Sequence, residues 1–182
     1  PVAIMMVYNN TPAAVMALKK SGIKSPADLS GKKLGAPVFD AGRRAFALSE
    51  KANGINNVAW TSMDPPLRET MLVRGDVDAI TGFTFTSLLN IEARGVPADQ
   101  VTIFPYADNG VKLYGNAIIA SPKMLKENPE AVKAFLIAFA KGAKDVMADP
   151  AAAIEAVKAR DGIINATLET RRLQLAIDTV IN

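Results

Sequence analysis

Short apolar runs alternate with helix-like segments through the middle of the chain, and this alternation constrains the fold more than any other feature. We expect strands at the apolar runs, which span 34–38, 58–61, 77–81 and 101–104. We expect helices at the segments between them, which span 40–53, 66–74 and 86–93. This alternation predicts an α/β fold with a mostly parallel sheet covered on both faces. Right-handed crossovers then place the strand ends and helix starts along one edge of the sheet.

The segments on either side of this block differ from it. Residues 2–8 form an apolar run that predicts a buried strand, and residues 13–18 are expected to pair back with it as an antiparallel strand. Beyond residue 121 the sequence predicts three helices, at 129–147, 150–160 and 169–180. The chain opens inside an expected core strand, with no charged leader and no initiating Met. We therefore expect a fragment that lacks an upstream part.

Two absences in the composition exclude several classes of protein. The chain has neither cysteine nor histidine, which excludes a Ser-His-Asp hydrolase and a zinc site built on imidazole or thiolate. The 21 Lys and Arg residues exceed the 18 Asp and Glu residues by only three, too few for a nucleic-acid-binding surface. No apolar stretch approaches the ~20 residues that span a bilayer. We expect a binding protein with no catalytic residues, no metal and no cofactor.

The first candidate binding segment joins a strand to a helix and contains Asp40, Ala41, Gly42 and Arg43. In open α/β sheets ligands bind outside the carboxyl ends of strands, near helix N-termini. The free backbone N–H groups of such a helix start favour a carboxylate, a sulfonate or another polar acceptor. The alternative is that Asp40 only caps the helix and that the arginines, Arg43 and Arg44, are solvated.

Two further segments are candidates. Gly82 at a strand end allows close approach of a ligand to the backbone, and Phe83 offers a ring for stacking. The alternative is a turn glycine followed by a core aromatic residue.

The third candidate segment contains Asn116, which is expected near Tyr8, where two strands cross, and its side chain offers both a donor and an acceptor. The alternative for this segment is a simple β-bulge.

Three stretches resemble a known family. The sequence IKSPADLSGKKLG at 23–35 resembles the opening segment of bacterial solute-binding proteins of ABC transporters. The sequences RGDVDA at 74–79 and YGNAIIAS at 114–121 resemble strands of the receptors for nitrate, sulfonate, taurine and thiamine-pyrimidine precursors. The resemblance extends over essentially the whole chain.

This resemblance implies a periplasmic-binding-protein-like type II fold, with two lobes of mostly parallel sheet joined by two crossing strands. Residues 1–20 and 113–182 would belong to lobe one, which is then incomplete, and residues 21–112 would form lobe two. Exposed edges of the incomplete lobe would favour a dimer. The family's ligand contacts would fall on Asp40, Ala41, Gly42, Arg43, Gly82, Phe83, Asn116 and Tyr8.

The function that the resemblance implies is an extracytoplasmic receptor, periplasmic or lipid-anchored, whose precursor has a signal peptide. It would bind a small polar or heterocyclic solute between its lobes, without transforming it, and deliver it to an ABC permease. One alternative is the effector-sensing domain of a LysR-type transcription regulator, which has the same bilobal architecture. Another is the related pyrimidine-precursor synthase, whose chemistry is associated with histidine and cysteine motifs that this chain lacks.

Overall fold

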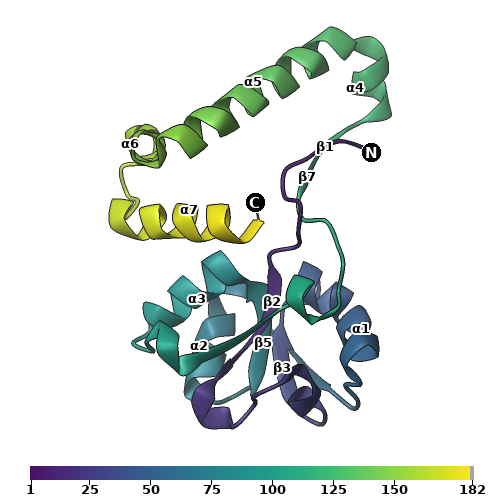
Figure 1. Cartoon of the computed structure of the whole chain (residues 1–182), viewed down its shortest axis with the longest axis vertical. Coiled ribbons are helices and arrows are strands. Elements are labelled where there is room, and N and C mark those ends of the chain that lie inside the picture. The colour runs from purple at the N-terminus through teal and green to yellow at the C-terminus, as the bar shows by residue number, and fades with distance from the viewer. Residues whose placement is uncertain (181–182) are drawn as a thin grey trace. The chain divides into compact units, whose positions relative to one another are not determined.

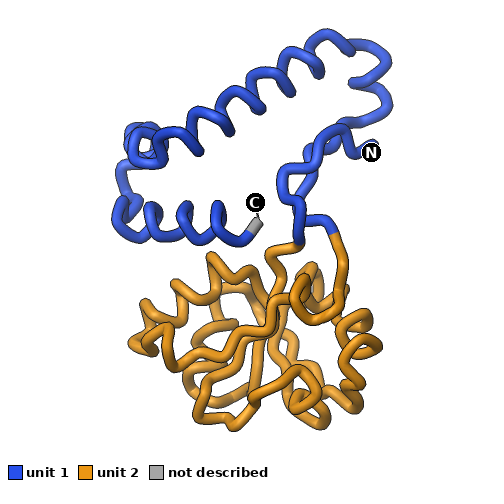
Figure 2. The backbone as a smooth tube through the Cα atoms, in the orientation of Figure 1, with its two compact units in different colours: residues 1–10, 114–182 blue, residues 11–113 orange. Residues whose placement is uncertain are grey.

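The computed structural model describes residues 1–180 and confirms the α/β class. The chain divides into two compact units (Figure 2). Unit 1 comprises residues 1–10 and the chain from 114 onward, and unit 2 comprises residues 11–113. The structural division therefore follows residue 10, whereas the sequence predicts a first boundary after residue 20. The second boundary lies one residue from the predicted one.

Unit 2 contains a five-stranded sheet with a helical layer on each side (Figure 1). The strands, in spatial order, are β4 (Ala59–Ser62), β3 (Lys33–Ala36), β5 (Ala79–Phe83), β2 (Ala13–Leu18) and β6 (Val101–Pro105). β3 is parallel to both β4 and β5, whereas β2 is antiparallel to both β5 and β6. The sheet is therefore mixed: four strands run in one direction and β2 runs against them.

The predicted pairing of residues 13–18 with the first strand is wrong. β2 lies between β5 and β6, where Val15 faces Thr81 on one side and Phe104 on the other. All six residues of β2 are buried. A strand that is buried on both faces reads as an uninterrupted apolar run, and such a strand belongs at the centre of a sheet.

The helices of unit 2 cover both faces of the sheet, as predicted. They are α1 (Ala41–Asn53), α2 (Arg68–Arg74) and α3 (Thr84–Glu92). Successive residues of β2 point to opposite faces of the sheet and belong to two hydrophobic clusters. Val15 packs in the same cluster as Phe46 of α1, and Met16 packs in the same cluster as Leu72 of α2. Short 3-10 helices occupy 19–21, 26–29, 65–67, 98–100 and 107–109. α1 ends at Gly54, whose φ of 65° is the left-handed conformation that glycine permits.

Unit 1 consists of a two-stranded antiparallel ribbon and a series of helices. The ribbon pairs β1 (Val2–Met6) with β7 (Ala117–Ala120). The helices are α4 (Pro122–Glu127), α5 (Pro129–Ala148), α6 (Pro150–Arg160) and α7 (Ala166–Val180). The predicted strand at 2–8 exists but is not buried, because each of its residues is exposed or half-buried.

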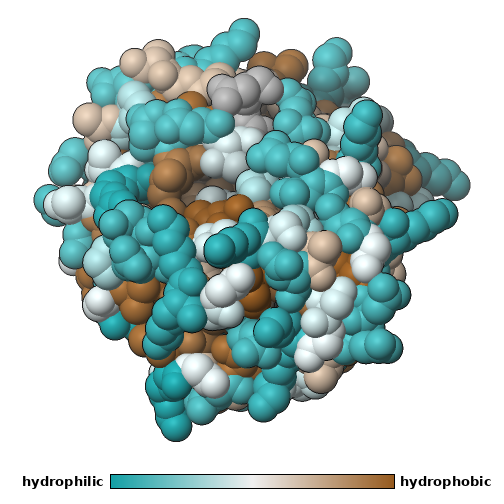
Figure 3. Space-filling model, turned by 60° about the horizontal axis from the view of Figure 1, so that its bottom comes forward, coloured by the Kyte–Doolittle hydropathy of each residue, from teal (hydrophilic) through white to brown (hydrophobic). Residues whose placement is uncertain are grey.

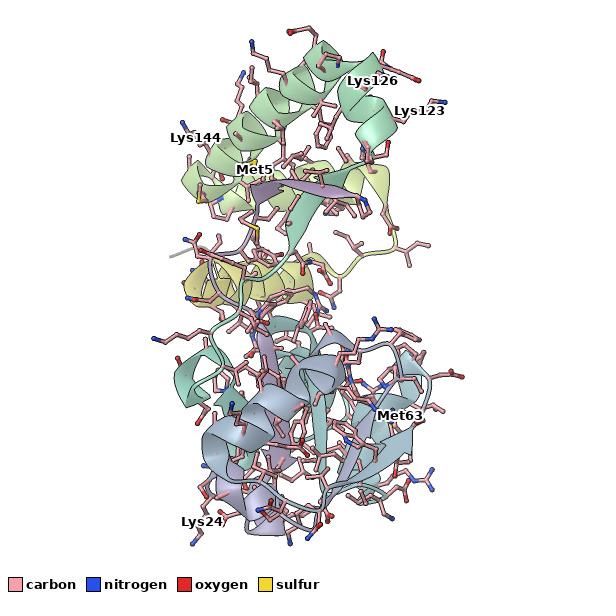
Figure 4. The ribbon with its side chains drawn as sticks, turned by 90° about the vertical axis from the view of Figure 1, so that its right-hand side faces the viewer. Met5, Lys24, Met63, Lys123, Lys126 and Lys144 are labelled. Carbon is pink, nitrogen blue, oxygen red and sulfur yellow. The ribbon has the colours of Figure 1, made fainter. Side chains whose placement is uncertain are left out.

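The apolar stripe of α5, formed by Val132, Phe135, Leu136, Phe139 and Ala143, is only partly covered within the described part of unit 1. No residue of α5 is buried, and Phe135 is 55% exposed. Lys123 and Lys126 on α4 and Lys144 on α5 extend outward from their helices (Figure 4). Along residues 1–180, no helix combines the length and apolarity that crossing a membrane would require.

Two neighbouring segments connect the units. In unit 1 the backbone N–H groups of Val7 and Tyr8 donate to the carbonyl oxygen of Asn116, at 2.9 and 3.3 Å. In unit 2 the N–H of Thr11 donates to the carbonyl oxygen of Leu113 at 3.0 Å. The two passes of the chain are thus hydrogen-bonded side by side, as two crossing strands would be.

Candidate functional site

A pocket lies at the edge of unit 2 where the parallel strands β3, β4 and β5 end. The carboxyl ends of parallel strands meet at one edge, which is where open α/β sheets bind ligands. Residues at or beyond the ends of all three strands contribute to this pocket, which has a volume of about 230 Å3. The residues that line it are Pro37, Phe39, Asp40, Ala41, Pro65, Arg68, Phe83 and Thr86.

A largely buried arginine forms the polar part of this pocket. The side chain of Arg68, which begins α2, is only 11% exposed. Its Nε and Nη2 donate to Glu69 Oε1 at 3.0 and 2.8 Å, and Nη2 also donates to Ser87 Oγ at 2.9 Å. Its Nη1 donates to Asp40 Oδ2 at 3.3 Å. Two carboxylates therefore hold one guanidinium, as a buried arginine requires.

Asp40 connects three elements around the pocket. Its Oδ1 accepts from the backbone N–H of Arg43 at 2.9 Å, which caps α1, and from Thr81 Oγ1 of β5 at 2.7 Å. Its Oδ2 meets Arg68 of α2. Asp40 therefore caps the helix, as the alternative predicts, but it does more than cap, because the same carboxylate also holds β5 and α2 together.

Two glycines lie behind the pocket rather than in its wall. A Cβ atom on Gly82 would overlap Ser87 Oγ and would lie 3.2 Å from Arg68 Cζ. Glycine at this strand end therefore makes room for the arginine. A Cβ on Gly42 would lie 3.0 Å from Asp40 Oδ1. Both glycines are buried, and their predicted contact with a ligand stays a prediction.

Tyr106 holds the first turn of α1 in place through a hydrogen bond. Its buried hydroxyl donates to the carbonyl oxygen of Gly42 at 2.8 Å. Burial raises the pKa of Tyr106 far above its usual range, and the negative charges of Asp40 and Glu50 act in the same direction. The tyrosine is therefore a neutral donor that positions the helix start.

The guanidinium of Arg43 is bonded outside the pocket. Its Nη1 donates to the carbonyl oxygen of Ala36 at 3.1 Å and to Ser62 Oγ at 2.9 Å. Its Cζ lies 4.8 Å from the centroid of the Trp60 ring, a cation–π contact. That ring meets Phe46 of α1 edge to face, with centroids 5.2 Å apart. Pairing of Arg43 with an anionic ligand stays a prediction.

Aromatic side chains supply the apolar part of the pocket. Phe83 lines it while also packing against the core of unit 2, so the ligand-facing and core interpretations are compatible. Phe39 is 67% exposed and also lines a second pocket, of about 510 Å3, together with Met63 beyond β4 (Figure 4). A large exposed aromatic ring beside a pocket is a typical ligand contact.

Tyr8 and Asn116, the last two predicted contacts, belong to unit 1. The predicted neighbourhood is confirmed, because the N–H of Gly115 donates to the carbonyl oxygen of Tyr8 at 3.2 Å and Asn116 bonds the same turn. A Cβ on Gly115 would lie 2.7 Å from the carbonyl oxygen of Asn10. The close approach of these two segments therefore depends on glycine. Ligand contact by Tyr8 and Asn116 stays a prediction.

Sequence reasoning missed Arg68, Phe39 and Thr86. Arg68 does carry a local signal, because the positive end of the helix dipole disfavours a cation in the first turn of a helix. Arg68 stands at that position, six residues after the end of β4, and there it pairs with the carboxylates of Asp40 and Glu69. Among residues 1–180 no group of three or more carboxylates is arranged to hold a metal ion.

Comparisons with known sequences show the family of the chain. A family model described as "NMT1/THI5 like" matches residues 2–153. The putative thiamine biosynthesis protein of Haemophilus influenzae is 30% identical over 159 residues, covering 82% of this chain and 47% of the relative. The riboflavin-binding protein RibY of Chloroflexus aurantiacus is 27% identical over 149 residues, covering 81% of this chain and 41% of the relative. The chain thus spans about half the length of these relatives, or less.

Comparison with solved structures supports the fold. The periplasmic aliphatic sulphonate binding protein SsuA of Escherichia coli matches with a TM-score of 0.75 and 16% identity, over 96% of this chain and 56% of that one. The alkanesulfonate-binding protein SsuA of Xanthomonas axonopodis, bound to MOPS, matches with a TM-score of 0.70 and 15% identity, over 93% of this chain and 57% of that one. At these identities the likeness shows the fold, which is the predicted one.

Proposed function

The chain belongs to the NMT1/THI5-like family of type II periplasmic binding proteins, and on that basis we propose that it is an extracytoplasmic solute receptor. It binds a small polar or heterocyclic molecule in the pocket at the ends of β3, β4 and β5 and delivers it to an ABC permease. The observation that carries this proposal is the pocket itself. In it the ion pair of Arg68 and Asp40 lies beside the rings of Phe39 and Phe83.

The chemistry of the pocket suits binding without reaction. The chain has no histidine or cysteine, so neither an imidazole for proton transfer nor a thiol nucleophile is present. The two charged side chains of the pocket, Asp40 and Arg68, already bind each other, while the apolar rings exclude water around a ligand. A polar group flanked by rings selects a ligand by hydrogen bonds and stacking.

The proposed location and partner rest on the relatives. The Escherichia coli match is named as a periplasmic binding protein and RibY as a riboflavin-binding protein. A receptor of this kind works outside the cytoplasm, in the periplasm or anchored to lipid, and presents its solute to a membrane permease. The comparisons do not favour the alternative of a LysR-type effector domain.

Ligand titration of the 182-residue chain tests the proposal. We expect at least one compound from a panel of sulfonates, nitrate, flavins and pyrimidines to shift the backbone amide signals of pocket residues in two-dimensional NMR spectra. The Phe39→Ala variant should weaken that binding about tenfold, because an exposed ring that stacks on a ligand contributes roughly 1 kcal/mol or more.

Phe135→Ala is the matched control, because Phe135 is also an exposed phenylalanine but lies on α5, outside the pocket. It should leave the affinity unchanged. A panel without any binder, or an equal loss of affinity in both variants, would contradict the proposal.

A further inference from the structure

We propose that this pocket selects a neutral planar group that presents a hydrogen-bond donor beside an acceptor, and that it rejects carboxylates and sulfonates. Primary amides and amino-substituted nitrogen heterocycles are such groups. This inference rests on the proposed function and adds a ligand class to it. The inference follows from the hydrogen-bonding atoms of Arg68 and Asp40 that are not fully used by bonds within the protein.

The acceptor is Asp40 Oδ2. Oδ1 of the same carboxylate is occupied by the N–H of Arg43 and by the hydroxyl of Thr81. Oδ2 receives only the Nη1 group of Arg68, at 3.3 Å, within the described chain. That distance exceeds the 2.7–2.9 Å that is typical of a charged N–H···O pair. Oδ2 therefore retains the capacity to accept a second hydrogen bond.

The donor is Nη1 of Arg68. A guanidinium has five N–H groups. Bonds to Glu69, Ser87 and Asp40 use Nε–H, both N–H groups of Nη2 and one of Nη1. The second N–H of Nη1 meets no acceptor among residues 1–180. The pocket edge thus presents a donor, Nη1, and an acceptor, Oδ2, 3.3 Å apart.

The charges around this edge disfavour an anion. Asp40 and Glu69 bring two negative charges to the one positive charge of Arg68. The nearby guanidinium of Arg43 is bonded to Ala36 and Ser62 instead. A carboxylate or sulfonate at the edge would place an oxygen without a proton against Oδ2, so one of its contacts would be repulsive.

The apolar walls favour a flat ligand of about one ring. Phe39 and Phe83 line the pocket, as does Pro65. A cavity of about 230 Å3 is at the small end for ligand sites, which restricts it to compact molecules. A single aromatic ring that carries an amide, or a ring with an amino group beside a ring nitrogen, can pack against the apolar walls. The same molecule can hydrogen-bond to both Nη1 of Arg68 and Oδ2 of Asp40.

Benzamide and benzoate test the inference with the 182-residue chain. They share ring, shape and size, and differ in that a donor NH2 of benzamide is replaced by an acceptor oxygen in benzoate. In NMR titrations we expect benzamide to shift the amide signals of Asp40, Phe83 and Thr86 with at least about tenfold higher affinity than benzoate. Equal or tighter binding of benzoate would overturn the inference, yet leave the proposed solute-binding function standing, because the pocket would still be occupied.

The Asp40→Asn variant adds a second test. Asparagine caps helices as well as aspartate does, so the start of α1 should persist, and the amide spectrum reports whether it does. The variant places an NH2 donor beside Nη1, so the preference for benzamide should fall about tenfold or reverse. Asp99→Asn, an exposed site of unit 2 outside the pocket, removes the same charge and should retain the preference.

An unchanged preference in Asp40→Asn would overturn the inference. Failure of both probes to bind the unmodified chain would overturn it too. The proposed function then falls only if the broader panel also contains no binder, so the two failures are distinguishable.

Discussion

The hydroxyl of Ser87 on α3 occupies the space that a side chain on residue 82 of β5 would need. Ser87 is held there by the Nη2 group of Arg68, which donates to its Oγ at 2.9 Å. The glycine thus has a packing role in the candidate site: it lets the arginine and serine approach the strand. Neither Gly82 nor Ser87 is exposed, so neither can move aside into solvent.

Gly82→Ala should therefore destabilise unit 2. The added methyl group overlaps Ser87 and crowds Arg68, and overpacking of this kind costs about 1–3 kcal/mol of unfolding free energy. Urea denaturation followed by far-UV circular dichroism measures the effect. Gly142→Ala is the matched control, because a Cβ at Gly142 in α5 meets no atom within 4 Å. It should be neutral or stabilise by about 0.5–1 kcal/mol. Equal losses in both variants would contradict the packing role.

Arg43→Lys should weaken the packing of β4 against α1. Lysine keeps the charge but loses the Nη1 group that bonds Ala36 and Ser62 and the planar guanidinium that lies over Trp60, at a cost of about 1 kcal/mol. Trp60 is the only tryptophan, so its fluorescence reports the change directly. Arg44→Lys, at the exposed neighbouring position of α1, should alter neither stability nor fluorescence. An unchanged Trp60 emission in Arg43→Lys would count against the stacking.

Local sequence signals sufficed for several helix ends, although the short helix α4 (Pro122–Glu127) was missed. Asp40 and Gly54 bracket α1 because a side-chain cap and a left-handed glycine act within a few residues of the chain. Asp149 caps α6 in the same way, with Oδ1 accepting from the N–H of Ala152 at 3.0 Å. Neither signal depends on distant parts of the chain, so the sequence alone is enough to predict these helix ends.

Strand pairing and the arginine network depend on residues far apart in the chain. Residues 13–18 pair with β5 and β6, more than 60 residues away, instead of with the adjacent apolar run. The sequence marks Asp40 as a candidate, but its partner Arg68 lies 28 positions further on and no periodic pattern links the two. The edge of the sheet was predictable from the order of strands and helices, whereas the partners at that edge were not.

The unpaired edges of unit 1 lead to a prediction of self-association. β1 and β7 pair only with each other within the described residues. An apolar groove of about 540 Å3 beside them is lined by Ile4, Ile118 and Phe135, among others. Exposed strand edges and apolar grooves favour pairing with another chain. The surface in Figure 3, by contrast, is mostly hydrophilic, with hydrophobic residues visible only as small separate patches.

Sedimentation velocity over a range of concentrations measures this association. We expect dimers of the 182-residue chain at high concentration, and we expect Phe135→Glu to shift the equilibrium towards monomer by at least about tenfold, because it places a charge in the groove. Lys133→Glu, on the exposed side of the same helix, is the control. A chain that stays monomeric at every concentration would contradict the predicted dimer.

Tyr106 should make the stability of unit 2 fall at alkaline pH. Because burial raises its pKa in the folded protein, the folded state keeps the phenolic proton where the unfolded chain, with a tyrosine pKa of about 10, has lost it. The folded state then binds more protons, so the free energy of unfolding decreases as pH rises above about 10. Tyr106→Phe should cost about 1 kcal/mol near neutral pH, where the hydrogen bond to Gly42 is lost, and should show a shallower decline above pH 10.

Urea titrations between pH 7 and 11 measure both effects. Tyr114→Phe serves as the control, since the Tyr114 ring is 72% exposed and its variant should follow the unmodified chain. If Tyr106→Phe also declines as steeply as the unmodified chain, the alkaline loss originates elsewhere.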